Sequence, residues 1–91
     1  MNHETMVEML KIDLGITTNV YDIRLNQLLD VATEEIKREG ATNLTPSSDI
    51  RDADLVIRYA EYLWRKRDTM EAMPRMLRWA LNNRVFGEKM A

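Results

Sequence analysis

The strongest hydrophobic pattern in the chain lies between residues 49 and 68, in the stretch DIRDADLVIRYAEYLWRKRD. At 100° per residue its apolar side chains fall on one broad arc, which leaves only a narrow polar wedge. The arc holds Ile50, Ala53, Leu55, Val56, Ile57, Tyr59, Ala60, Tyr62, Leu63 and Trp64. The wedge holds Arg51, Asp54, Arg58, Glu61 and Arg65. This pattern predicts a long helix that either forms the centre of a monomeric bundle or is covered in part by another subunit.

Two amphipathic helices are predicted before this stretch. Residues 4 to 14 form a short helix with its apolar side at Met6, Val7, Leu10 and Leu14 and its polar side at Glu4, Glu8 and Lys11. Gly15 ends this helix because glycine accepts the left-handed conformation. Residues 20 to 39 form a long core-facing helix with Asn19 as its N-cap and Gly40 as its stop. Its opposite side is an acidic stripe that includes Asp22, Asp30 and Glu34.

The remaining segments are a loop, a last helix and a tail. Residues 41 to 48, ATNLTPSS, have loop composition, and Ser48 is the expected cap of the central helix. Pro74 fits the first turn of a helix that continues to about Asn83. Residues 85 to 91 show neither periodicity nor caps, so we expect a mobile or partner-bound tail. The predicted fold is one all-α domain over residues 1 to 91, ordered over about 4 to 84, with two long and two shorter helices.

Composition and charge narrow the functional classes. A chain of 91 residues without cysteine holds one modest core and no disulfide, thiolate metal site or cysteine nucleophile. No run approaches the roughly 18 apolar residues of a membrane span, and no signal-peptide pattern is present, so we expect a soluble protein made in the cytoplasm without a membrane partner. Residues 1 to 49 contain 4 Lys/Arg against 9 Asp/Glu, whereas residues 50 to 91 contain 9 against 6. This asymmetry fits either opposite faces of a monomer or head-to-tail contacts between copies.

The sequence offers little catalytic chemistry. His3 is the only histidine, and it stands near the start of the chain without further ligands at a spacing that favours a metal. The three glycines each follow a helical stretch, and none opens a phosphate-binding turn. We therefore expect no metal site, no cofactor and no enzymatic activity. Met70, Met73 and Met76 recur every third residue around Pro74, which suits either core filling or an adaptable contact surface.

Three segments carry a resemblance to a known family. They are LKIDLGI at residues 10 to 16, KREGA at residues 37 to 41 and YAEYLWRKRD at residues 59 to 68. With the order of helices over residues 6 to 84, they resemble the head-to-tail connector proteins, or adaptors, of long-tailed bacteriophages and prophages. The resemblance implies an all-helical protein at the virion head-tail junction. It would form a ring, usually dodecameric, beneath the portal protein, extend the DNA channel and dock stopper or tail completion proteins.

The resemblance also suggests roles for particular residues. Candidates for the subunit or portal interface are Leu55, Arg58, Tyr59, Tyr62, Arg65, Arg67, Met70, Met73, Val85 and Phe86. Candidates for an acidic channel or exposed face are Asp22, Asp30 and Glu34, because a channel that bound phosphate would retain the DNA. The alternative is a small helical DNA-binding module in packaging or regulation, which would use Arg75, Arg78 and Arg84.

Overall fold

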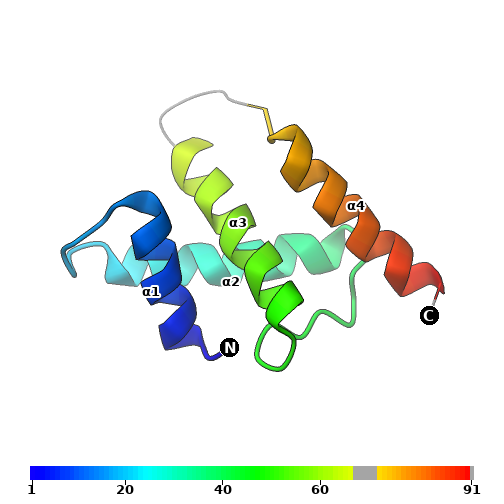
Figure 1. The fold of residues 1–91 in the computed structure, drawn as a ribbon, viewed down its shortest axis with the longest axis horizontal. Helices are drawn as coiled ribbons and strands as arrows, with labels where there is room; N and C mark the ends of the chain where they lie inside the picture. Colours follow the sequence, from blue (N-terminus) through cyan, green and yellow to red (C-terminus); the bar gives the residue numbers. More distant parts are fainter. Residues whose placement is uncertain (67–71, 91) are drawn as a thin grey trace.

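The computed structural model describes residues 1–66 and 72–90, and these residues form four helices and no strand. The helices are α1 (His3–Leu14), α2 (Asp22–Arg38), α3 (Ile50–Lys66) and α4 (Arg75–Met90). In Figure 1, α2 crosses behind α1 and α3, while α4 lies along the far side of α3. The all-α prediction is confirmed. Only α1 is short, however, because α4 has 16 residues and α2 and α3 have 17 each.

Local capping sets both ends of α1. The side chain of Asn2 accepts a hydrogen bond from the Thr5 amide at 2.7 Å, which satisfies one free donor of the first turn. Gly15 adopts φ 71°, and the amide of Ile16 then donates to the Lys11 carbonyl at 2.9 Å. Ile16 is partly buried against the core. The predicted stop at Gly15 is confirmed.

The link between α1 and α2 differs from the prediction. Helix α2 begins at Asp22, and the Asn19 side chain does not cap it but accepts a hydrogen bond from Lys11 Nζ at 2.8 Å. Lys11, expected on the polar side of α1, is buried and lies 3.0 Å from Asp22 Oδ1. The ammonium group is buried because two oxygens from the link and α2 replace its water.

Helix α3 is the central element of the bundle and packs against each of the other three helices. The Asp49 side chain, rather than Ser48, caps it by accepting from the amides of Arg51 at 2.8 Å and Asp52 at 3.4 Å. Ala53, Val56 and Ala60 are fully buried, and Leu55, Ile57 and Tyr59 nearly so. The broad arc is therefore covered mainly by the chain itself. Ile50, at the start of the helix, is the clear exception and remains exposed.

The predicted C-terminal tail is wrong over the described residues, since α4 continues to Met90. Val85 packs against the end of α2, where Gly40 has φ 132° and a Cβ would stand 2.9 Å from Val85 Cγ1. Arg84 and Glu88 point inward and form ion pairs instead of apolar contacts. Hydrophobic periodicity misses this half of the helix because its inward-facing residues include an arginine and a glutamate.

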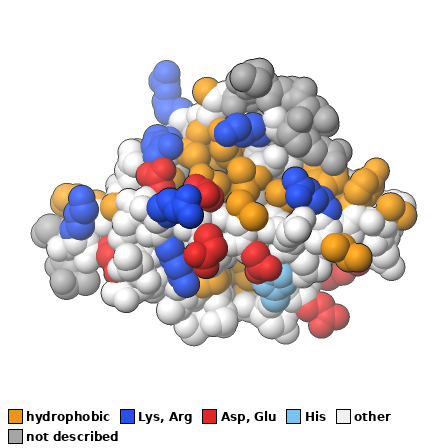
Figure 2. All heavy atoms as spheres, turned by 180° about the vertical axis from the view of Figure 1, so that it is seen from behind, with side chains coloured by type: hydrophobic (Ala, Val, Ile, Leu, Met, Phe, Trp, Pro, Cys, Tyr) orange, Lys and Arg blue, Asp and Glu red, His pale blue; other side chains and the backbone are white. Residues whose placement is uncertain are grey.

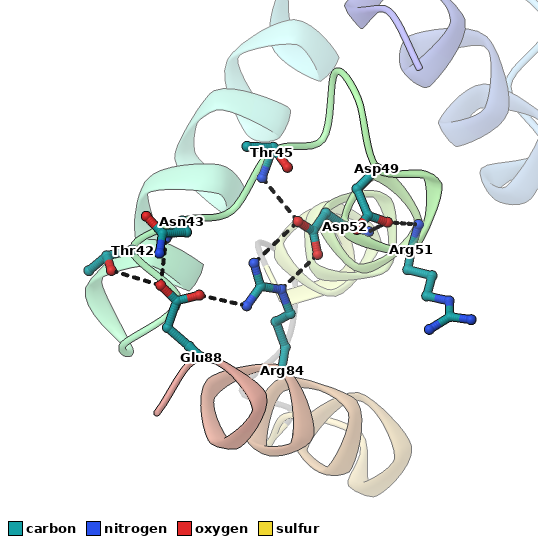
Figure 3. A network of polar contacts seen from close by, with 8 residues as sticks. All are labelled: Thr42, Asn43, Thr45, Asp49, Arg51, Asp52, Arg84 and Glu88. Atoms are coloured by element: carbon teal, nitrogen blue, oxygen red, sulfur yellow. Dashed lines mark hydrogen bonds and ion pairs between the residues drawn. The ribbon is translucent and has the colours of Figure 1, made fainter. Parts of the chain in front are cut away.

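A buried ion pair joins α4 to the start of α3 (Figure 3). Arg84 donates from Nε to Asp52 Oδ1 at 2.8 Å and from a terminal nitrogen to Oδ2 at 3.3 Å. The Thr45 amide adds a third hydrogen bond to Asp52 Oδ2 at 3.0 Å, and Asp52 is only 2% exposed. Burial alone would raise the pKa of Asp52, but the hydrogen bonds from Arg84 and Thr45 outweigh it and lower the pKa.

Glu88 extends this network to the loop that follows α2. It accepts from Arg84 at 2.9 Å, from the Thr42 hydroxyl at 3.1 Å and from the Asn43 amide at 3.1 Å. Figure 3 shows these groups converging from α3, α4 and the loop. The network therefore fixes where α4 lies relative to the rest of the bundle.

We expect Arg84→Ala to lower the free energy of unfolding by about 3 kcal/mol, because it leaves the Asp52 carboxylate buried without its partner. Urea denaturation followed by circular dichroism measures this loss. Arg75→Ala removes an exposed arginine from the same helix and should change stability by less than about 0.5 kcal/mol. Equal losses for both variants would show that the ion pair does not hold α4.

Candidate interaction surface

The structure separates the predicted interface residues into buried and accessible groups. Leu55 and Tyr59 are only 6% and 7% exposed because α2 and α4 pack over that side of α3, so most of each side chain is inaccessible to a partner. Arg58, Arg65 and Phe86 are exposed, and Tyr62, Met73 and Val85 are half-buried. Arg67 and Met70 lie outside the described residues.

Three of these predicted residues meet at one groove of about 500 Å³ between α2, α3 and the start of α4. We call it the tyrosine groove. Its lining consists of Val31, Glu35, Tyr59, Tyr62, Leu63, Lys66, Met73 and Arg78. The Tyr59 and Tyr62 rings meet edge to face with centroids 6.0 Å apart, and Lys66 Nζ lies 5.6 Å from the Tyr62 ring. Seen from behind the view of Figure 1, the molecule shows apolar side chains among basic and acidic ones (Figure 2).

The chemistry of the tyrosine groove suits protein contact. Burial raises the pKa of Tyr59, and the nearby carboxylates of Glu35 and Glu39 raise it further. The phenol therefore stays neutral at physiological pH. The lining combines the apolar and aromatic side chains of Val31, Leu63, Met73 and the two tyrosines with charges of both signs from Glu35, Lys66 and Arg78. Apolar and aromatic groups flanked by charged ones are typical of surfaces that contact other proteins.

A second hollow of about 230 Å³ lies between α3 and α4, lined by Arg58, Glu61, Tyr62, Arg65, Pro74, Met76 and Leu77. Arg58 pairs with Asp54 at 3.0 Å, as its spacing predicted. Burial raises the pKa of Glu61 to about 7, assisted by a hydrogen bond and charge repulsion from Asp13. Arg65 and Arg58 oppose this shift without overcoming it.

The three predicted acidic residues do not form one open stripe. Asp30 and Glu34 are exposed on α2, and Asp30 Oδ1 lies 3.2 Å from His3 Nε2. Asp22 instead pairs with the buried Lys11, so its charge is compensated within the chain. The assignment of Asp22 to a free acidic face is therefore wrong, whereas Asp30 and Glu34 remain accessible.

Sequence reasoning missed an apolar stripe on the outer side of α4. Met76, Trp79 and Phe86 are 69%, 63% and 63% exposed, respectively. Their spacing of three and seven residues places them on one helix face, but the prediction ended the helix at about Asn83. Extending the helical register past that residue would have revealed the stripe.

Residues 1–66 and 72–90 contain neither a metal-ligand cluster nor a membrane-spanning helix. No group of three or more histidine, cysteine, aspartate or glutamate side chains within these ranges is arranged to hold a metal ion. No helix in the same ranges is long and apolar enough to cross a membrane.

Comparison of the chain with protein-family models, curated proteins and solved structures gives no significant match.

We expect Glu61→Gln to flatten the pH dependence of stability. Because the folded pKa of about 7 exceeds the unfolded value of 4.5, the contribution of Glu61 to stability is fully present below pH 4.5 and is lost as the pH rises through 7. Allowing for solvent screening, Glu61→Gln should be about 1 kcal/mol more stable than wild type at pH 8. Thermal unfolding between pH 4 and pH 8 tests this. Glu34→Gln removes an exposed carboxylate and controls for net charge; parallel profiles for wild type and Glu61→Gln would contradict the assignment.

Proposed function

We propose that this protein is a structural head-to-tail connector, or adaptor, of a bacteriophage or prophage. In this proposal it oligomerises into a ring beneath the portal, lets DNA pass without specific binding and catalyses no reaction. The ring extends the DNA channel at the virion head-tail junction and docks a stopper or tail completion protein. The observation that carries the proposal is the tyrosine groove, which brings Tyr59, Tyr62 and Met73 together on one side of the helical bundle.

Two further features support this role. The chain covers its central helix internally, so it is a compact unit that can remain folded before it meets a partner. It nevertheless leaves several large apolar side chains exposed, including Ile23, Ile50 and Trp79. Exposed apolar surface of this kind marks protein contact sites because association removes it from water. The mechanism of a connector is this formation of interfaces.

The DNA-binding alternative has less support. Arg84, one of its three arginines, is engaged by Asp52 and Glu88 and is not available to a phosphate. Arg78 lies 3.4 Å from Glu39, so its charge is partly compensated. Arg75 is exposed, but a single arginine that contacts phosphate gives only weak binding.

Light scattering over a range of concentrations, with and without the purified portal, tests the proposed function. We expect a ring-sized species, either in solution or only on the portal. Tyr62→Glu should abolish this assembly because it places a charge in the tyrosine groove, while circular dichroism should show a folded chain. Thr17→Glu, in the exposed link after α1, is the matched control. A monomeric or dimeric mass that does not change when the portal is added would overturn the proposal.

A further inference from the structure

Helix α4 has an outer face with the properties of a contact surface. Met76, Trp79 and Phe86 lie within an arc of about 80°, on the side opposite the buried Leu77 and Leu81. We call this set the α4 stripe. A tryptophan and a phenylalanine that are each 63% exposed on one helix face are unusual unless a partner covers them.

The charges beside the α4 stripe are basic. Arg75 and Lys89 are exposed at the two ends of the helix. Two copies that joined through their α4 stripes would bring Arg75 near Lys89 in an antiparallel arrangement, or near its own equivalent in a parallel one. Like charges at such close range oppose association, so a two-fold contact of α4 with itself is disfavoured.

The outer face of α2 offers a complementary surface. Ile23 is 85% exposed and Val31 is 43% exposed, and the exposed acids Asp30 and Glu34 lie on the same arc. We call these four residues the α2 face. At the helical rise per residue, Ile23 and Val31 are about 12 Å apart along the axis, compared with about 10.5 Å for Trp79 and Phe86. The two surfaces therefore carry apolar groups at similar spacing. Asp30 and Glu34 are opposite in sign to Arg75 and Lys89, and the charge of Arg38, which is exposed on the same arc of α2, is partly compensated by Glu35 at 3.7 Å.

We propose that the α4 stripe of one copy packs across the α2 face of a second copy. Because the two surfaces differ and α2 and α4 occupy different sides of the molecule (Figure 1), each copy uses one surface for each neighbour. Such a heterologous contact repeats, and it gives a ring when its rotation closes. The closure of this contact into a ring rests on the proposed function. The pairing of the two surfaces rests only on their own shape and charge.

Disulfide trapping tests this pairing, since the chain has no native cysteine. Asn83→Cys places a thiol within the α4 stripe and Gln27→Cys places one within the α2 face, and both side chains are exposed. An equal mixture of the two variants, oxidised at high protein concentration without the portal, should give mixed dimers several-fold above either homodimer. Dominant Asn83→Cys homodimers, a statistical mixture or no covalent dimer would overturn the proposal.

Charge reversal gives an independent test by sedimentation velocity at low salt. Arg75→Glu/Lys89→Glu and Asp30→Lys/Glu34→Lys should each weaken self-association at least tenfold, and mixing the two variants should restore it. Thr17→Glu is the control and should associate as the wild type does. Failure of the mixture to associate better than its components would contradict the pairing.

These results separate the inference from the proposed function. Mixed disulfides together with indifference to the portal would retain the pairing and reject the connector. If a ring forms on the portal but oxidation of the mixed cysteine variants gives no mixed disulfides, even in the presence of the portal, the connector role is retained and the pairing is rejected.

Discussion

The position of α4 depends on the ion pair between Arg84 and Asp52. Removing two charges from water is costly, and this cost is offset only where the geometry is good and the remaining acceptors are satisfied. Here the guanidinium makes two hydrogen bonds to the carboxylate, and the Thr45 amide makes a third. The same arginine donates to Glu88, which also receives bonds from the loop after α2. These polar contacts thus hold α4 in place together with the apolar contacts of Leu77 and Leu81, which are both buried.

This placement of α4 determines which surfaces the molecule presents. The tyrosine groove takes Met73 and Arg78 from the α4 side and Tyr59 and Tyr62 from α3. The α4 stripe faces away from the bundle because Leu77, Leu81 and Arg84 turn the opposite side of the helix inward. Both candidate contact surfaces therefore depend on one buried polar network, although neither surface includes Asp52 or Arg84.

The distribution of charge follows the same division between helices. Asp30 and Glu34 are exposed on α2, where Arg38 is also exposed but pairs with Glu35, while Arg75 and Lys89 are exposed on α4. Within the chain, oppositely charged pairs such as Arg78 with Glu39 join these two helices near the groove. Between copies, the same polarity would select a contact of unlike surfaces over a contact of like ones.

The sequence by itself determined the helical class, the central place of residues 50 to 66, the stop at Gly15 and the core positions Leu10, Leu25 and Val56. These features follow from hydrophobic period and local capping, which involve residues a few positions apart. Only the tertiary structure decided that Lys11 and Asp52 are buried and that the chain remains helical to Met90. It also decided which apolar residues stay outside. A buried charge requires a partner that is distant in sequence, as Arg84 is from Asp52, and no local pattern of hydrophobic and polar residues contains that information.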